Sequence, residues 1–384
     1  MKKALIALSF GGLTIGITEF VMMGLLPDIA RDLSVSIPKA GYLISAYALG
    51  VVIGAPTLVL MARNYPPKKI LLVFAAMLTV FNALSIIAPN YEVLFVSRLL
   101  SGLPHGAFFG VGAVVASRLA TKGKEAQAIS IMFAGLTFAN LIGVPVGTYI
   151  GHEFSWRYSF ALVAIIGLIT FTALSFWMPV LESDKPGSVK SQLVFFSNPR
   201  AWYIILITAI GFGGLFCWIS YIAPLLTDIS GFSAESVSSI LILAGFGMVV
   251  GNFLGAKLAD KYSPALTILM LLLAMALDLT LVLFTSFNPV ASLILVFFTG
   301  CISFAVVAPI QMLMIQTAKG SEMIASAALQ ASFNIGNALG AFLGGIPLVM
   351  GYDFTSPNVV GLMMALVGAV ITTVLIFRMK KDQA

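Results

Sequence analysis

The chain has 384 residues, of which 60% are hydrophobic and only 9% are charged, and its mean hydropathy is +1.05. Soluble domains carry about 25% charged residues, so this composition excludes an ordinary soluble protein and predicts one that crosses a membrane many times. The net charge of +6 would suit an acidic partner. Because the cations cluster between apolar stretches, however, we expect no nucleic acid to bind.

Twelve apolar stretches are long enough to span a membrane, since a spanning helix needs about 20 apolar residues. Backbone groups inside lipid must be paired, so these stretches are predicted to be helices rather than strands. The start, MKKALIALSFGG, resembles a signal peptide, but the apolar run continues to Leu26 without a clear cleavage site, which predicts a retained first helix. The predicted spans are 4–27, 38–62, 68–88, 91–118, 127–150, 158–179, 202–228, 235–259, 265–285, 290–318, 323–350 and 357–378.

A repeat with a constant offset of 197 residues relates the two halves of the chain. KGKEAQAISIMFAGLTFANLIGVPVGTYIG, which begins at Lys122, corresponds without a gap to KGSEMIASAALQASFNIGNALGAFLGGIPL, which begins at Lys319. Gly50-x-x-x-Gly54 corresponds in the same way to Gly247-x-x-x-Gly251. We therefore predict an all-α membrane protein with two parallel-repeat six-helix halves, 1–180 and 201–384, joined by a cytoplasmic linker at 181–200.

The positions of lysine and arginine predict the orientation in the membrane. With the N-terminus inside, seventeen of the 21 cations fall in cytoplasmic segments, and only Arg31, Lys39 and Arg157 fall in external ones. Arg98 lies within a span. Both termini are therefore predicted to be cytoplasmic, and the basic balance is explained as a topology signal.

Several motifs carry a resemblance to a known family. They are EFVMMGLLPDIARDL and AGYLISAYALGVVIGAP near the start, RLLSGLPHGAFFGVG in the fourth span, and ANLIGVPVGTYIG followed by SWRYSF. On these motifs the chain resembles the major facilitator superfamily, and more narrowly its drug:proton antiporter and sugar-efflux branch, which includes the arabinose-type efflux permeases. The resemblance implies halves that rock alternately around a midplane substrate site. It also implies an antiporter motif at Gly143-x-Pro145-x-Gly147 and a buried fourth-span arginine at Arg98.

One loop departs from the family pattern. Between spans two and three the superfamily usually has Gly-x-x-x-Asp-Arg, whereas this chain reads LVLMARNYPPKK, with Ala62 at the expected acidic position. The second copy, GAKLADKYSP, keeps Asp260 and Lys261. The usual charge latch is therefore not expected in the first half.

Two charged residues are predicted to lie inside the membrane-spanning part. Glu19 precedes Pro27 by eight residues, about 12 Å along the helix, and Arg98 follows Glu92 by six, about 9 Å. A charge near a helix centre costs roughly 3 kcal/mol on insertion scales, so both should face the protein interior and could pair. Our hypothesis is that Glu19 is the proton-coupling group and Arg98 its partner or a substrate contact. The alternative is an ion pair that only fixes helix packing.

Two further titratable residues lie in predicted spans. His105 follows Arg98 by seven residues, two turns along the same face, and could relay a proton or bind a sugar hydroxyl. The alternative for His105 is a hydrogen bond to the backbone of a neighbouring helix. Asp278 lies in the ninth span, which is peripheral scaffold in the resembling family. We favour a structural polar contact for Asp278, with proton coupling as the alternative.

The second half is predicted to supply most of a neutral substrate site. Leu295 stands at the position that corresponds to Arg98, and the nearby polar residues are amides and aromatics. Such groups suit an uncharged, hydroxyl-bearing or amphipathic ligand, although amides can also simply link helices. The predicted substrate-binding residues are Trp218, Tyr221, Gln311, Gln330 and Asn334.

Small residues in spans five and eleven predict close helix approach and, as a functional hypothesis, a flexible seam between the halves that opens and seals the cavity. A proline among them would bend its helix. The predicted seam residues are Gly135, Gly143, Pro145, Gly147, Gly340 and Gly344.

No sequence pattern indicates an enzyme, a cofactor site or a metal site. Gly110-Val-Gly112 lies in mid-span without a preceding strand, and no P-loop occurs. Cys217 and Cys301 stand alone in apolar runs and are interpreted as buried hydrophobic residues. We expect a monomer in the bacterial inner membrane whose partners are a small-molecule substrate, protons and lipid.

The predicted function is proton-coupled export of a small neutral solute, such as a sugar or an amphipathic drug. Three alternatives stay open. The chain could be an importer on the same fold, an exporter of nucleosides or purines, or a membrane sensor that transports nothing. The short loops disfavour the sensor.

Overall fold

The computed structural model describes residues 2–35, 37–62, 64–121, 125–181, 194–318 and 320–381. Within these residues all regular structure is helical, and twelve helical stretches are long and apolar enough to cross a membrane. The predicted all-α fold with twelve spans is thereby confirmed. Most of the predicted linker lies outside the described residues, as do Lys122, Lys319 and the side chain of Asp260.

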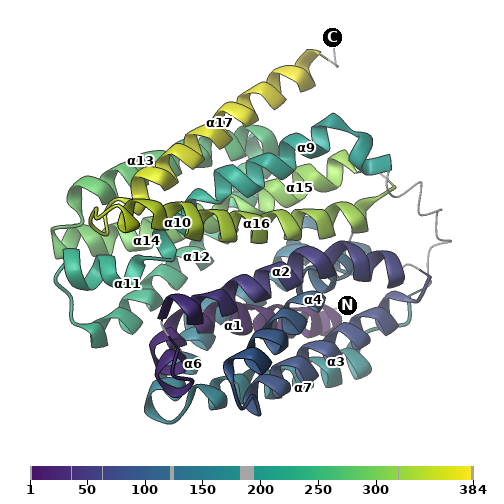
Figure 1. Ribbon diagram of the computed structural model, residues 1–384. Coiled ribbons are helices and arrows are strands. Elements are labelled where there is room, and N and C mark those ends of the chain that lie inside the picture. Colours follow the sequence, from purple (N-terminus) through teal and green to yellow (C-terminus); the bar gives the residue numbers. More distant parts are fainter. Residues whose placement is uncertain are drawn as a thin grey trace. The chain divides into compact units, whose positions relative to one another are not determined.

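The chain divides into two compact units (Figure 1). The N-terminal unit comprises Met1–Leu193 with Gly320–Ala331, and the C-terminal unit comprises Val194–Lys319 with Ser332–Ala384. The division at 193/194 falls inside the predicted linker, and the first part of α16 groups with the N-terminal unit.

The N-terminal unit holds the first six spans. Its elements are α1 (Lys2–Asp32), α2 (Ile37–Ala62), α3 (Pro67–Ile86), α4 (Tyr91–Leu119), α5 (Glu125–Phe138), a π-helical turn (Ala139–Gly143), α6 (Val144–Glu153) and α7 (Trp156–Trp177).

The C-terminal unit holds the other six, except for the first part of α16. Its elements are a 3₁₀ turn (Val194–Ser197), α9 (Pro199–Leu206), a π-helical turn (Ile207–Phe212), α10 (Gly214–Ile219), α11 (Ile222–Pro224), a third π-helical turn (Leu225–Ile229), α12 (Ala234–Tyr262), α13 (Pro264–Thr285), α14 (Pro289–Ala305), α15 (Val307–Thr317), α16 (Glu322–Val349) and α17 (Pro357–Lys381).

The same helix pairing recurs in both units. In the N-terminal unit Gly50 and Gly54 of α2 face the backbone of α4, and in the C-terminal unit Gly247 and Gly251 of α12 face the backbone of α14. A methyl group on any of these glycines would collide with main-chain atoms. The facing pairs are Gly50 with Leu99, Gly54 with Leu103, Gly247 with Phe297, and Gly251 with Cys301. The repeat in the sequence is therefore a repeat of close helix packing.

Irregular turns interrupt three of the predicted spans near prolines. Pro145 lacks an N–H, and its ring would collide with the carbonyl four residues earlier. The backbone before it widens into a π-helical turn, in which Val144 N donates to Ala139 O, five residues back. Pro309 has the same steric relation to Ala305, where α14 ends and α15 begins. The predicted single spans 127–150, 202–228 and 290–318 are each built from several pieces.

The first helix extends five residues beyond its predicted end. Pro27 lies inside α1, and Ile29 and Ala30 beyond it are buried, so packing offsets the hydrogen bond that the proline removes. Glu19 lies 13 residues before the end of α1, about 20 Å along the axis, rather than the 12 Å predicted from Pro27. The carboxyl is therefore nearer the middle of its helix than the sequence indicated.

Side-chain contacts of the SWRYSF segment join the C-terminal end of α1 to the start of α7. Trp156 Nε1 donates to Asp32 at 2.9 Å, and Arg157 forms an ion pair with the same carboxylate at 2.5 Å. His152 Nδ1 lies 2.5 Å from Asp28 Oδ2 at the same end of α1. These contacts lie at one end of the unit, away from its middle.

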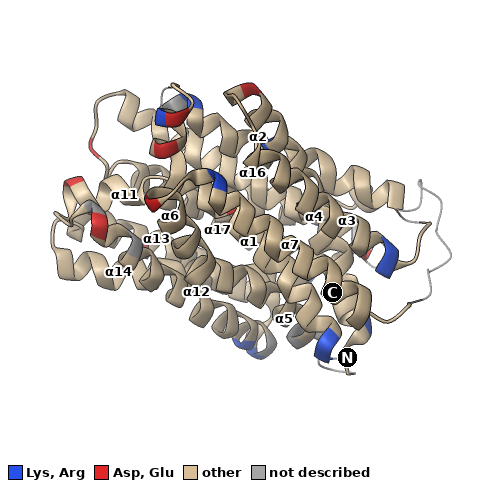
Figure 2. Cartoon of the chain, turned by 90° about the horizontal axis from the view of Figure 1, so that it is seen from below, with Lys and Arg blue, Asp and Glu red and all other residues tan. Residues whose placement is uncertain are grey.

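Charged residues gather near helix ends, whereas the middle parts of the helices carry few of them (Figure 2). Among the described residues, three charged ones lie well inside long helices and are nevertheless buried. Glu19 is 8% exposed, Arg98 is 0% exposed and Asp278 is 5% exposed. A buried charge is costly in a membrane protein and commonly marks a functional site, so these three are the starting point for one.

Candidate functional site

A buried polar cluster joins α1, α3 and α4 inside the N-terminal unit. Arg98 donates one N–H to Thr18 Oγ1 and another to Thr18 O, both at 2.8 Å. Thr18 Oγ1 in turn donates to Asn82 Oδ1 at 2.5 Å, and Asn82 Nδ2 donates to Leu78 O at 2.8 Å. The guanidinium is thus held in one orientation by a chain of hydrogen bonds.

Aromatic rings pack against the same guanidinium. Its central carbon lies 4.5 Å from the ring centroid of Tyr47 and 5.4 Å from that of Phe160. Cation–π contacts of this kind contribute about 2 kcal/mol or more when the cation is desolvated. Within the part of the chain that the structure describes, Arg98 Nε has no hydrogen-bond partner. An incoming acceptor, such as a hydroxyl of a solute, would recover the cost of that unmade bond.

Tyr47 links the arginine to His105. The Tyr47 hydroxyl lies 3.1 Å from His105 Nδ1, and both side chains are buried. The His105 ring also packs edge-on against Phe109, with 5.5 Å between centroids. The partner of His105 Nδ1 is therefore a side-chain hydroxyl on another helix rather than a backbone carbonyl.

Glu19 belongs to this cluster but does not pair directly with Arg98. No N–O distance of 4.0 Å or less joins these two described residues, because the guanidinium fork is occupied by the neighbouring Thr18. The Arg98 charge is nonetheless close enough to act electrostatically on Glu19, and the Glu19 charge acts on Tyr47. The expected pairing is thus indirect. A role of Glu19 in proton coupling stays a prediction.

Asp278 has a simpler environment in the C-terminal unit. Thr299 Oγ1 on α14 donates to Asp278 Oδ2 on α13 at 2.6 Å. This contact between neighbouring helices is the structural role favoured by the sequence. Asp278 therefore serves as a comparison for Glu19, since both are buried intramembrane carboxyl groups.

Four of the five residues predicted to bind substrate are buried and Tyr221 is half-buried, and the structure assigns the five to different units. Gln330 groups with the N-terminal unit and the other four with the C-terminal unit. Trp218, Gln311, Gln330 and Asn334 are at most 4% exposed. Tyr221 donates its hydroxyl hydrogen to Ala341 O at 2.7 Å, an interhelical bond. A shared substrate site for these residues stays a prediction.

The predicted seam residues of the N-terminal unit lie against α1. Gly135 faces the backbone at Ser9, and a methyl group on Gly143 would lie 2.5 Å from Ile17 Cγ1. A methyl group on Gly147 would lie 2.9 Å from Val21 Cγ2. Close helix approach, the structural part of the prediction, is therefore present within this unit.

In the C-terminal unit the matching glycines of α16 lie against α10 and the turn before it. Gly340 faces the carbonyl of Gly213, and a methyl group on Gly344 would lie 3.2 Å from Cys217 Cα. The two halves thus use corresponding glycines for corresponding contacts. A role in opening and sealing a cavity stays a prediction.

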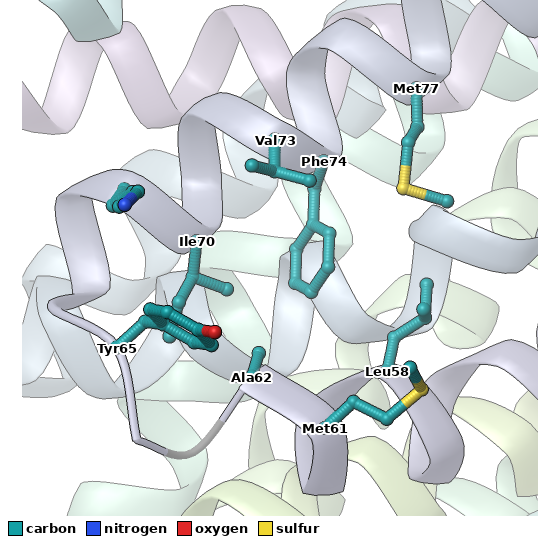
Figure 3. Close-up of a pocket in the computed structure, with 9 residues that line it drawn as sticks. Leu58, Met61, Ala62, Tyr65, Ile70, Val73, Phe74 and Met77 are labelled. Carbon is teal, nitrogen blue, oxygen red and sulfur yellow. The ribbon is translucent and has the colours of Figure 1, made fainter.

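A groove of about 440 Å³ lies between α2 and α3 (Figure 3). Met61 and Val73 in its lining are 73% and 50% exposed, so it opens on the outer surface of the unit. Ala62, at the position where the family usually has an acid, is one of the lining residues. The lining is mostly apolar, and Lys69 is its one charged residue. With so few hydrogen-bonding groups the groove does not suit a polar solute. It is a poorer candidate site than the buried cluster.

The described residues contain no candidate metal centre. Among the residues that the structure describes, no group of three or more His, Cys, Asp or Glu side chains could hold a metal ion. The two cysteines, Cys217 and Cys301, are buried and free, as predicted.

Comparison with known proteins decides the family. Residues 8–328 match the family model described as Major Facilitator Superfamily. The chain belongs to the major facilitator superfamily. It is therefore a membrane transporter for a small-molecule substrate rather than an enzyme, and the resemblance inferred from its motifs is confirmed.

Two relatives from Escherichia coli K12 cover nearly the whole chain. The chain is 40% identical to the "Putative transporter AraJ" over 386 residues, which is 100% of this chain and 97% of that protein. It is also 40% identical to the "Inner membrane transport protein YdhP" over 361 residues, which is 94% of this chain and 92% of that protein. Together with the twelve spans, these relatives indicate a multi-pass protein of a bacterial inner membrane.

Among solved structures, the crystal structure of the E. coli fucose:proton symporter FucP is similar, with a TM-score of 0.75 and 13% identity. The match covers 97% of this chain and 98% of that one. At this low identity the likeness shows that the two proteins share a fold.

Proposed function

We propose that the protein is a proton-coupled antiporter that exports a small neutral solute, such as a sugar or an amphipathic drug, by alternating access. The observation that supports this function best is the buried cluster of Glu19, Arg98, Tyr47 and His105. It combines a carboxyl group that can gain or lose a proton with a cation fixed beside it. Intramembrane groups of this kind commonly form proton relays and substrate pathways in transporters.

The cluster can couple a proton to a neutral solute in a simple way. Glu19 would exchange its proton whenever the site opens to one side of the membrane. The net charge beside the fixed Arg98 then changes by one unit. If the solute binds better to one protonation state, linkage requires that solute binding alters the proton affinity of Glu19 by the same factor. Exchange of one proton for one solute follows when the two disfavour each other.

The chemistry of the second half supports an uncharged cargo. Its predicted contacts, Trp218, Tyr221, Gln311 and Asn334, carry no formal charge. Hydroxyl groups of a sugar could bond the amides, and apolar faces could pack on the rings. Within the N-terminal unit, Arg98 Nε, which has no hydrogen-bond partner among the described residues, could donate to a solute hydroxyl.

Symport is the second candidate, because the fold neighbour FucP is named a fucose:proton symporter. The same carboxyl group would serve either direction. In a symporter, protonation of Glu19 would favour solute binding instead of opposing it. The direction of transport therefore depends on whether protonation of Glu19 weakens or strengthens solute binding. A flux measurement decides between the two.

The deciding experiment is transport by the purified protein in lipid vesicles with an imposed pH gradient. We expect one member of a panel of radiolabelled sugars, nucleosides and amphipathic drugs to move against the proton flux, and a protonophore to abolish the gradient-driven part. Movement in the same direction as protons would establish symport. If no solute in the panel shows proton-linked flux, the proposal is wrong.

The proposed orientation, with both termini in the cytoplasm, has its own test. Cys217 and Cys301 are buried, so the chain offers little reactive background for cysteine labelling. We expect a membrane-impermeant maleimide added outside to label Arg31→Cys, whose native side chain is 81% exposed. It should label Lys257→Cys only after the membrane is opened. The reverse pattern would invert the topology.

A further inference from the structure

We propose that the C-terminal unit carries a binding site for the headgroup of an anionic phospholipid. The site is a groove of about 670 Å³ where the start of α9 meets the end of α17, two helices that run side by side (Figure 1). It lies apart from the buried cluster described above, in the other unit. The residues that line it are Asn198, Pro199, Arg200, Tyr203, Val374, Phe377, Arg378 and Lys381.

Three cations converge on this groove. Arg200, Arg378 and Lys381 all line it, and none of its eight lining residues is acidic. Arg378 is steadied by Tyr203, because its guanidinium carbon lies 5.3 Å from the centroid of that ring. Arginine forks bind phosphate oxygens through two parallel hydrogen bonds, and lysine adds a point charge. The groove is thus suited to a phosphate group with a net negative charge.

Apolar side chains in the same groove identify the ligand as a lipid rather than a soluble anion. Val374 and Phe377 are 40% and 68% exposed, and they precede Arg378 on α17, a helix long and apolar enough to span the membrane. A phospholipid has a phosphate followed by acyl chains, and this order matches the cations and the neighbouring apolar side chains of the groove. Inorganic phosphate or a nucleotide would use the cations and leave the apolar part of the groove uncovered.

The location along the chain agrees with this ligand. The charge distribution predicts that this end of the unit faces the cytoplasm, where anionic lipids are exposed to the protein. Basic pockets between helices on that side bind anionic headgroups, with each cation near the surface contributing to the affinity. Phosphatidylglycerol and cardiolipin have the required negative charge, whereas phosphatidylethanolamine is neutral overall.

The test is lipid titration of the detergent-purified, full-length protein, read by native mass spectrometry. We expect phosphatidylglycerol and cardiolipin to bind and phosphatidylethanolamine to bind at least about tenfold more weakly. The double variant Arg378→Gln/Lys381→Gln should lose about thirtyfold in affinity for cardiolipin. The matched control Lys257→Gln/Lys261→Gln removes two cations from the end of α12, outside the groove, and should bind cardiolipin as the parent protein does.

Two further arms distinguish the sources of the phosphate. Inorganic phosphate at millimolar concentration should fail to displace cardiolipin, and displacement would show a soluble-anion site instead. Thermal melting of the parent protein with each lipid gives a readout that does not depend on whether the double variant folds. Cardiolipin should raise the melting temperature more than phosphatidylethanolamine does. Equal effects of the two lipids, or equal binding by the two double variants, would overturn the proposal.

Discussion

The variant Glu19→Gln is expected to lose solute transport driven by a pH gradient, by about a hundredfold, while exchange of labelled for unlabelled solute continues. Glutamine has nearly the shape of protonated glutamate but cannot release a proton. Glu19 makes no direct ion pair with Arg98, so the substitution leaves the Arg98–Thr18 hydrogen bonds in place. The measurement is flux into vesicles with and without a pH gradient, alongside solute exchange at equal pH.

Asp278→Asn is the matched control for this prediction. It neutralises the other buried intramembrane carboxyl group, whose contact is the hydrogen bond from Thr299. We expect gradient-driven transport to remain and stability to fall by about 0.5–1.5 kcal/mol, the usual net contribution of a hydrogen bond. Retained gradient-driven transport in Glu19→Gln would remove Glu19 from the coupling mechanism. Equal losses in both variants would point to a general effect of neutralising buried carboxyl groups.

The architecture was predictable because lipid imposes strong rules on sequence. A span needs a long apolar run and must satisfy its own backbone, so twelve runs translate into twelve helices. Gly50-x-x-x-Gly54 and Gly247-x-x-x-Gly251 share one offset, and in the structure both segments press against a neighbouring helix. A close approach of backbones tolerates little besides glycine, which is why this packing is visible in the sequence.

The ends and interruptions of helices were harder to predict. The sequence predicts that the first span ends at Pro27, yet α1 continues to Asp32. A proline removes one hydrogen bond and bends the chain, but burial of the residues beyond it can outweigh that cost. The π-helical turn before Pro145 has the same origin. Local propensity alone does not decide between ending a helix and distorting it.

The candidate site was half visible in the sequence. Glu19, Arg98 and His105 stand out because titratable groups are costly inside an apolar run. Thr18 and Tyr47 do not, since hydroxyl-bearing side chains are ordinary in spanning helices. Their importance comes from facing Arg98 across helix boundaries, and the sequence does not contain that geometry. For the same reason the sequence suggested a direct ion pair, whereas the arginine fork is taken by Thr18.

Gly54→Ala is expected to be among the most destabilising single substitutions of a small residue in the chain. A methyl group at this position would collide with the main chain at Leu103, which has no rotamer to change, so α2 and α4 would have to separate. Overpacking typically lowers stability by about 1–3 kcal/mol. We expect a loss at or above the upper end of this range, because the added methyl group would collide with main-chain atoms. Gly251→Ala should behave alike, since its methyl group would meet the main chain at Cys301. The measurement is thermal melting of each purified variant in detergent, with the yield of folded protein.

Gly41→Ala supplies the matched control on the same helix as Gly54. Apart from the backbone of its own helix and its chain neighbours, no atom of the described residues lies within 4 Å of a methyl group built at Gly41. Alanine has a higher helix propensity than glycine by about 1 kcal/mol, so this variant should melt at the same temperature as the parent or slightly higher. If Gly54→Ala and Gly41→Ala melted together, the α2–α4 contact would not be as close as the structure shows. If Gly54→Ala were destabilised and Gly251→Ala were tolerated, the helix contact in the C-terminal unit would be looser than the one in the N-terminal unit. The sequence repeat would then reflect common ancestry more than equally close packing.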